Sequence, residues 1–387
     1  MPLSAEKLAN IRSFHREVNS PNKDGFTSNA PLLLALEPTT RCNFHCVHCS
    51  RAFANQASSD MSLELFEKVV DAARTAYELY LFGDGEVLLD VPRHLAMISR
   101  IYRQDPECRL GFSTNGKLLT PEVYELYATA GIEYIQISVD AATKGLYETM
   151  GRGGNFDELL SNLEGIAAFR RRSKMRYPRL QLATVISQQN YRELPLLAKF
   201  AAEYDFYYWY IIAEYPHNAG RDRLRLSTED LAEVESMKAD IMRDYGTCYS
   251  TVFDPSLGFS AGENEEWSVT DSAVFCTVPW QHFELKANGD VKICPYFHKP
   301  VCSMNGKSLA EVWNGKEFRE IRKAFTSRSG IPSYCVKCNL GLRRQYLPGW
   351  PGLPDVPRDG LPARTIRSAG AVKALISRWA ASNLTCA

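Results

Sequence analysis

The sequence lacks a net charge of either sign, long apolar runs and internal repeats. Its 45 lysine and arginine residues balance 45 aspartate and glutamate residues, so the overall charge gives no reason to expect a nucleic-acid or membrane partner. The longest aliphatic run, Leu32–Leu36, is far too short to cross a bilayer, and the N-terminus has no signal-peptide core. We therefore expect a cytoplasmic protein that binds neither nucleic acid nor membrane.

Hydrophobic residues make up 45% of the 387 residues and charged residues 23%, which is typical of a chain that forms a folded core. Between residues 31 and 225, short apolar runs alternate with helical patterns, which indicates βαβ units and a parallel sheet. Six such units predict an α/β fold, a partial (β/α)6 TIM-like barrel with its site at the carboxyl ends of the strands. The expected strands are Leu32–Leu36, Leu79–Phe82, Leu110–Ser113, Tyr134–Val139, Leu180–Ile186 and Tyr207–Ile212.

The rest of the chain differs in character from the barrel. We expect a small α+β domain with a hairpin turn at 288–290, followed by a linker rich in proline and glycine. The predicted division is 1–30 for an N-terminal helix and lead-in, 31–225 for the barrel, 226–270 for a helical bridge, 271–347 for the small domain, and 348–387 for the linker and a tail helix.

Eleven cysteines are many for a chain in a reducing compartment, where disulfides rarely persist. Seven of them stand in three groups, and such spacing indicates metal binding before disulfides. The grouped residues are Cys42, Cys46 and Cys49, then Cys276 and Cys294, then Cys335 and Cys338.

The loop after the first expected strand reads CNFHCVHC, which places three thiols at Cys-x3-Cys-x2-Cys. Three thiolates on one short loop can bind three irons of a [4Fe-4S] cluster and leave the fourth iron open to chemistry. Two alternatives stay open at this point. One is a zinc site completed by His45 or His48, and the other is a set of three structural thiols.

With this loop, the sequence resembles the radical S-adenosylmethionine (SAM) enzymes over residues 31–212. Further motifs follow in the order typical of that family, each after an expected strand: GDGEVLL at 83–89, STNG at 113–116, SVD at 138–140, and YETMGRGGNFDELLSNL at 147–163. The sequence departs from the family at His48, where an aromatic residue is usual, and at Val87, where proline is usual.

The resemblance implies a [4Fe-4S] cluster whose open iron is chelated by SAM. One electron then cleaves SAM to methionine and a 5′-deoxyadenosyl radical, which takes hydrogen from a substrate C–H bond. The implied residues are Cys42, Cys46 and Cys49 for the cluster, Gly85 and Glu86 for the SAM amino group, Ser138 and Asp140 for the ribose hydroxyls, Arg152 for the SAM carboxylate, and 184–187 and 211–213 for the adenine.

The later cysteines form a second signature, Cys276-x12-Gly-x4-Cys294 followed by Cys335-x2-Cys338. It resembles the SPASM or twitch extension of radical SAM enzymes, without the further cysteines of a full SPASM domain. The resemblance implies one fully ligated auxiliary [4Fe-4S] cluster that transfers electrons or positions substrate. A four-cysteine zinc ribbon is the alternative, and Cys302 is near enough in sequence to replace a ligand.

The one-cluster pattern most resembles aminocyclitol enzymes such as 2-deoxy-scyllo-inosamine dehydrogenase. It implies dehydrogenation of a hydroxyl group on a small sugar, aminocyclitol or aminoglycoside intermediate, with the auxiliary cluster as electron acceptor and a flavodoxin or ferredoxin as one-electron donor. The first alternative is an epimerase in which a cysteine donates hydrogen, Cys248 before Cys302 and Cys108. Maturation of a ribosomal peptide and a non-enzymatic iron–sulfur or zinc scaffold are the others.

Overall fold

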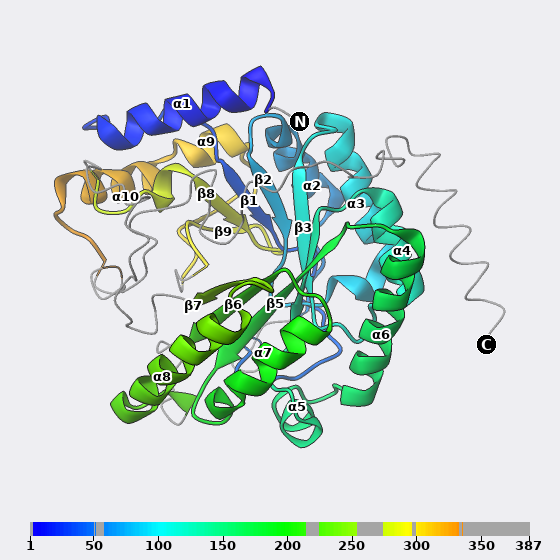
Figure 1. The fold of residues 1–387 in the computed structure, drawn as a ribbon. Coiled ribbons are helices and arrows are strands. Elements are labelled where there is room, and N and C mark those ends of the chain that lie inside the picture. Colours follow the sequence, from blue (N-terminus) through cyan, green and yellow to red (C-terminus); the bar gives the residue numbers. More distant parts are fainter. Residues whose placement is uncertain are drawn as a thin grey trace.

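The described part of the chain is built around one sheet, with helices packed along its outer side (Figure 1). The structure is a computed structural model. It describes residues 3–49, 51, 58–213, 224–253, 274–295, 299–332 and 335. The ten-stranded sheet of these residues has the order β10-β9-β8-β1-β2-β3-β4-β5-β6-β7.

The strands and helices have the following bounds. The strands are β1 (Leu33–Leu36), β2 (Glu78–Leu81), β3 (Arg109–Thr114), β4 (Tyr134–Ser138), β5 (Arg179–Ile186), β6 (Tyr208–Ala213), β7 (Ser250–Phe253), β8 (His282–Leu285), β9 (Asp290–Lys292) and β10 (Cys302–Ser303). The helices are α1 (Ala5–Asn19), α2 (Leu63–Val70), α3 (Val91–Gln104), α4 (Pro121–Ala130), α5 (Lys144–Met150), α6 (Phe156–Ser173), α7 (Leu194–Glu203), α8 (Thr228–Tyr245), α9 (Leu309–Trp313) and α10 (Lys316–Ser327).

Strands β1 to β6 are parallel neighbours in chain order, which confirms the predicted α/β class and the partial barrel. Alternate residues of β2 and β3, such as Leu79, Leu81 and Phe112, are buried in the main hydrophobic core. The helices that follow the strands contribute their buried faces to the same core, so each βαβ unit is held by apolar packing. The opposite face of these strands is the interior of the barrel.

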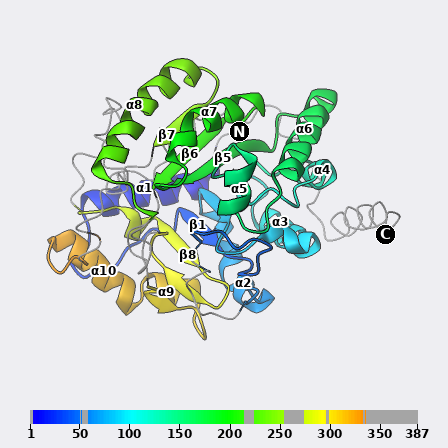
Figure 2. The same ribbon diagram turned by 90° about the horizontal axis from the view of Figure 1, so that it is seen from below.

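The sheet extends beyond the six predicted strands at both edges. β7 pairs in parallel with β6, within the stretch predicted as a helical bridge. At the other edge β8 pairs in parallel with β1, and β9 and β10 follow antiparallel (Figure 2). The predicted hairpin joins β8 to β9, with Gly289 at φ +90° and Lys286 N–H donating to Asp290 O at 2.8 Å. Both additions cover strand edges that would otherwise present unpaired backbone groups.

Helix α1 lies across the amino ends of β1 and β2 and shares a core with α10 (Figure 1). The Asn10 side-chain amide donates to the carbonyls of Ala30 and Thr75, directly before those two strands. Ile11, Phe14 and other apolar residues of α1, η8 (Val278–Trp280) and α10 form a second, smaller core. The N-terminal helix therefore joins the barrel to the C-terminal part of the sheet.

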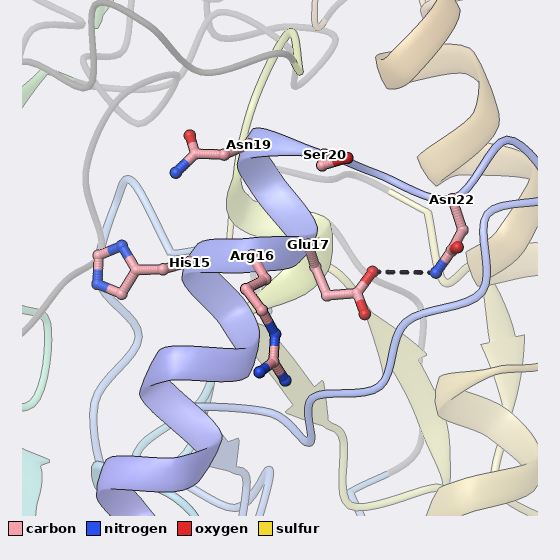
Figure 3. A pocket seen from close by; sticks show the side chains of 6 residues that line it. All are labelled: His15, Arg16, Glu17, Asn19, Ser20 and Asn22. Carbon is pink, nitrogen blue, oxygen red and sulfur yellow. Dashed lines mark hydrogen bonds between the residues drawn. The ribbon is translucent and has the colours of Figure 1, made fainter.

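A hollow of about 570 Å³ lies at the end of α1 (Figure 3). Glu17 reaches across it to accept a hydrogen bond from the Asn22 amide at 3.1 Å, while His15 points away from this pair. The hollow is on the amino-end side of the strands, whereas a barrel builds its site at the carboxyl ends. In the described part of the chain, no helix is both long and apolar enough to span a membrane.

His94 on α3 is a titratable side chain that is buried between the helices and the sheet. Its Nδ1 lies 2.7 Å from the Tyr127 hydroxyl, and its ring contacts the edge of Phe112. Burial lowers the pKa of His94 from 6.5 to about 3. The folded protein therefore keeps this imidazole neutral at pH values where the unfolded chain protonates it.

We predict that the free energy of unfolding falls as the pH drops below 6.5, because only the unfolded chain then binds a proton at His94. The loss is up to about 1.4 kcal/mol per pH unit. Urea unfolding at pH 7, 6 and 5 measures it, and the slope should be smaller by that amount in His94→Phe. Equal slopes in the two proteins would show that His94 does not titrate in this way.

Candidate active site

The loop with the first three grouped cysteines follows the carboxyl end of β1. Cys42, Cys46 and Cys49 are all half-buried. The His45 N–H donates to the carbonyl of Arg152, in the turn between α5 and α6, at 2.7 Å, and the Val47 N–H donates to that of Met150, the last residue of α5, at 2.9 Å. The cysteine loop is therefore fixed by the segment in which the sequence showed the MGRGG motif.

Gly153 in that turn allows the two segments to approach each other. Its φ is +102°, a conformation that residues with a side chain rarely adopt. A Cβ atom here would lie 2.6 Å from the carbonyl oxygen of Asn43. Any larger residue would push the turn away from the cysteine loop.

The three thiols lie near enough to oppose each other's ionisation. Burial, the Glu86 carboxylate and Cys49 raise the pKa of Cys42, while the Phe44 N–H and Arg51 oppose the rise. Burial and the Asp140 carboxylate raise the pKa of Cys46, with smaller contributions from Cys49 and Cys42. Thiolates gathered in this way need a cationic partner, and cluster iron supplies one. The donor set therefore fits an iron–sulfur cluster held by Cys42, Cys46 and Cys49.

Glu86 belongs to the loop after β2, and its side chain is buried, with 1% exposed. Its Oε1 accepts hydrogen bonds from Leu88 N–H at 3.0 Å and Thr114 Oγ1 at 2.9 Å, and its Oε2 accepts one from Asn115 N–H at 2.7 Å. Burial raises the pKa of Glu86, while these three hydrogen bonds oppose the rise. Glu86 thus ties the loop after β2 to the end of β3, and one acceptor position on Oε2 is left.

Asn115 joins Glu86 to the cysteine loop, a role that sequence reasoning missed. Its side-chain amide donates to Asn43 Oδ1 at 2.7 Å and lies 3.9 Å from Cys42 Sγ. The sequence identifies the STNG motif by its place after the third strand, but it assigns no role to any single residue of the motif. Only the fold reveals that the Asn115 side chain reaches the cysteine loop that follows β1.

Gly85 lies directly against the backbone that leads into the cysteine loop. A Cβ atom on Gly85 would be 2.2 Å from Thr39 O and 2.7 Å from Arg41 O. The next residue, Glu86, donates its N–H to the same Arg41 carbonyl at 2.7 Å. The loop at 83–86 and the cysteine loop therefore form one packed unit.

Asp140 and Ser138 lie at the carboxyl end of β4, as the sequence predicts for groups facing a bound nucleoside. Asp140 Oδ1 accepts from Val185 N–H at 2.8 Å, and Oδ2 lies 3.3 Å from His48 Nε2. Ser138 is exposed. The departure from the family at His48 thus gives Asp140 a polar contact on the cysteine loop.

Arg152 holds the cysteine loop through its backbone, because its carbonyl accepts the His45 N–H. Its side chain is exposed, and within the described residues its guanidinium has no hydrogen-bond or ion-pair partner. Among the adenine candidates, Thr184 and Ser187 are buried, and their hydroxyl groups already donate to Val139 O and Asn190 Oδ1. The roles of these residues toward SAM stay predictions.

Cys248 is not brought to the site. It is exposed in the turn after α8, two residues before β7 begins at Ser250. Because β7 runs parallel to β6, this turn lies at the amino ends of the strands. The cysteine loop lies at the carboxyl ends, so the position of Cys248 does not favour a role as hydrogen donor.

The later cysteines gather around β8, β9 and the second core. Cys276 and Cys335 both pack against that second core, and Cys335 and Cys294 both contact the main one. Cys302 stands on β10, next to β9, and burial raises its pKa to about 11. Cys338 lies outside the described residues. The three described members of the predicted auxiliary set thus share one region of the sheet.

The zinc alternatives require ligands around one ion. In the ranges that the structure describes, no three histidine, cysteine, aspartate or glutamate side chains surround a single-ion position. The cysteine loop fits an iron–sulfur cluster because its three thiols lie close together and its backbone is held by hydrogen bonds.

Half-buried polar side chains line the interior face of β2, β3 and β4. The Tyr80 hydroxyl donates to Gln136 Oε1 at 2.6 Å. On the intervening strand β3, Ser113 is the register partner of Gln136, and Gly111 is the register partner of Tyr80. Ser138 follows two residues further along β4 toward the carboxyl end. A polar surface therefore leads along the barrel interior toward the cysteine loop.

These features define a class: an α/β barrel with a three-cysteine loop at the carboxyl ends of its strands and a second cysteine set on an added sheet edge. Family models identify it. The radical SAM superfamily model matches residues 36–201, and the iron–sulfur cluster-binding SPASM domain model matches residues 276–339. The chain belongs to the radical SAM superfamily and carries a SPASM domain. These domains imply SAM, a SAM-binding [4Fe-4S] cluster and an auxiliary iron–sulfur cluster.

Known proteins with related sequences come from several branches of this superfamily. The chain is 25% identical to the AdoMet-dependent heme synthase of Methanosarcina barkeri, over 82% of this chain and 93% of that protein. It is 24% identical to the tungsten-containing aldehyde ferredoxin oxidoreductase cofactor-modifying protein of Pyrococcus furiosus, over 79% and 87%. It is 27% identical to the mycofactocin maturase MftC of Mycobacterium tuberculosis, over 46% and 43%.

Two solved structures share the fold at low sequence identity. Streptococcus suis SuiB bound to S-adenosylmethionine superposes with a TM-score of 0.59 at 17% identity, covering 87% of this chain and 75% of that one. The protein anSMEcpe with bound AdoMet and a peptide gives 0.58 at 14% identity, covering 92% and 98%. Identities this low support the shared fold and nothing finer.

We predict that Asn115→Ala weakens iron–sulfur binding, because it removes the amide contacts to Asn43 and Cys42. Outer contacts around a metal centre are worth ~10–100-fold in affinity. The measurement is iron and sulfide retained after anaerobic reconstitution and a chelator challenge. Asn162→Ala is the matched control, since the Asn162 amide donates to the carbonyls of Gly116 and Lys117 but not to the cysteine loop. Equal iron loss in both variants would contradict the prediction.

Proposed function

We propose that this radical SAM enzyme is an oxidoreductase acting on a small polar molecule, and that it dehydrogenates a carbon bearing a hydroxyl group. The observation that carries the proposal is the row of half-buried polar groups, Tyr80, Ser113 and Gln136, on the barrel interior. Hydroxyl and amide groups suit a hydroxylated substrate, because each can donate and accept. A sugar, aminocyclitol or aminoglycoside intermediate fits this chemistry.

In this proposal Cys42, Cys46 and Cys49 hold the SAM-binding cluster, and Gly85 and Glu86 receive the SAM amino group. The remaining acceptor position of Glu86 Oε2 suits an ammonium donor. When bound, cluster and SAM supply a 5′-deoxyadenosyl radical, and the auxiliary cluster supplies an electron acceptor. The other proposed contacts are Ser138 and Asp140 with the ribose hydroxyls and Arg152 with the SAM carboxylate.

The oxidation balances as follows. The carbinol carbon gives one hydrogen atom to the radical, the hydroxyl proton leaves to a basic group or water, and the remaining electron leaves toward the auxiliary site. The alcohol becomes a ketone. We propose Cys276, Cys294, Cys335 and Cys338 as the auxiliary ligands and a flavodoxin or ferredoxin as the donor for SAM cleavage. The pairing of β8 with β1 places the two cysteine sets on neighbouring strands of one sheet, the first set at the carboxyl end of β1 and Cys276 and Cys335 against the second core at the amino ends.

The names of the long-matching relatives favour a small molecule. Two proteins that match over most of their own length are named a heme synthase and a cofactor-modifying protein. Both names describe work on cofactors. Modification of a ribosomal precursor peptide is the second candidate, and the 27% identity to a mycofactocin maturase over 177 residues favours it.

The test uses the anaerobically reconstituted protein, dithionite, SAM and a panel of hydroxylated sugars, aminocyclitols and aminoglycosides. We expect one substrate to raise 5′-deoxyadenosine formation and to lose two hydrogen atoms by mass spectrometry, with its deuterium label recovered in 5′-deoxyadenosine. Cys42→Ala should abolish the reaction, because it removes a proposed cluster ligand.

Other results separate the alternatives. Uptake of one solvent deuterium without a change in oxidation state would indicate epimerisation. A modified peptide would indicate maturation. No SAM cleavage by protein that contains both clusters would overturn the proposal.

A further inference from the structure

A buried ion cluster, here termed the Lys286 cluster, connects the SPASM part of the sheet to the 83–86 loop. Lys286 Nζ lies 2.5 Å from Glu37 Oε1, 3.2 Å from Asp84 Oδ2 and 3.8 Å from Glu284 Oε1. Lys292 Nζ lies 3.7 Å from the same Glu284 oxygen. The members come from the end of β1, the loop after β2, and β8 and β9, so three separate parts of the chain meet here.

Glu37 stands in the middle of this contact and is 1% exposed. Its Oε1 accepts the Asp84 N–H at 2.8 Å, and its Oε2 accepts the Ala287 N–H at 3.1 Å. A Cβ atom on Gly83 would lie 2.4 Å from the Glu37 side chain. The loop after β2 and the β8–β9 turn are therefore held against one shared carboxylate.

Lys286 is the cation that makes this arrangement stable. Although burial opposes it, the carboxylates of Glu37, Asp84 and Glu284 raise the pKa of Lys286, so the ammonium stays charged. A buried carboxylate without its cation is strongly unfavourable. Loss of Lys286 would therefore leave the Glu37 and Asp84 carboxylates without their shared cation, which favours displacement of Asp84 and its loop.

We propose that Lys286 is a positioning residue for SAM: the β8–β9 hairpin, through Lys286, sets the 83–86 loop in the form that receives the SAM amino group. The inference rests on the assignment of Gly85 and Glu86 to SAM in the proposed function. It makes SAM affinity depend on a residue of the SPASM domain that does not touch SAM. Lys286→Met should then weaken SAM binding more than it slows turnover at saturating SAM.

Lys292 offers a matched control. Both lysine side chains are 16% exposed, both lie on the β8–β9 hairpin, and both contact Glu284. Only Lys286 contacts Glu37 and Asp84. A general cost of removing a half-buried lysine from this hairpin would therefore affect Lys286→Met and Lys292→Met alike, whereas loop positioning would affect only the first.

The experiment compares reconstituted wild type, Lys286→Met, Lys286→Arg, Lys292→Met and Glu86→Gln. SAM dissociation constants come from the change in the EPR signal of the reduced cluster on titration with SAM, and KM and kcat from 5′-deoxyadenosine formation. For Lys286→Met we expect a dissociation constant and a KM raised roughly tenfold, the scale of lost outer contacts around a metal centre. We expect kcat to change little, Lys286→Arg to recover part of the affinity, and Lys292→Met to match wild type.

A second readout does not depend on SAM. Hydrogen–deuterium exchange of the SAM-free holoprotein should rise in the peptide covering residues 82–88 in Lys286→Met and not in Lys292→Met. Should Lys286→Met fail to reconstitute, the charge-neutral pair Glu37→Gln with Lys286→Gln replaces it, because no buried charge is then left alone. Normal SAM affinity in that pair would overturn the inference.

The outcomes distinguish a failure of the proposed function from a failure of the Lys286 inference. If Glu86→Gln binds SAM as wild type does, the assignment of the loop in the proposed function is wrong. If Glu86→Gln loses affinity and Lys286→Met does not, the proposed function stands and the Lys286 inference is wrong. Equal losses in Lys286→Met and Lys292→Met would also overturn the inference, since they indicate general destabilisation of the hairpin.

Discussion

The parallel pairing of β1 on both of its edges is the constraint on which the rest of the structure depends. β1 pairs in parallel with β2 on one side and with β8 on the other, so the carboxyl ends of all three strands lie at the same end of the sheet. The cysteine loop leaves from β1 and the GDGE loop from β2. Glu37, directly after β1, then receives backbone and ionic contacts from both neighbours. One short strand thus places the cysteine loop, the GDGE loop and the SPASM hairpin together.

Hydrogen bonds from buried polar groups restrict the conformations that these loops can adopt. Glu86, Asn115 and Glu37 each connect two loops, and almost all of their hydrogen-bonding capacity is used. Removing a partner from such a network leaves a buried group unsatisfied, which costs more than the bond itself contributes. A radical enzyme gains from this rigidity, because the reactive species must meet only the intended C–H bond and be kept from water.

The interior of the barrel combines this rigid frame with a polar surface. Tyr80, Ser113 and Gln136 belong to strands rather than loops, so their positions are set by the sheet register. Groups held in this way select a ligand by shape and by hydrogen bonding more than by charge, in keeping with the zero net charge of the chain. The SPASM strands close the same interior from the other edge, which brings the second cysteine set within one continuous sheet.

The sequence by itself determined the six parallel strands, the loop with Cys42, Cys46 and Cys49, and the hairpin at Gly289, because hydrophobic period, ligand spacing and turn chemistry are local properties. It did not reveal β7, the pairing of β8 with β1, or the contacts of Asn115 and Lys286. Nor did it show that Cys248 lies at the amino ends of the strands. These depend on which edges and loops meet after folding, across separations of up to 250 residues for Glu37 and Ala287. Only the tertiary structure decides such pairs, since no local pattern encodes a partner so distant along the chain.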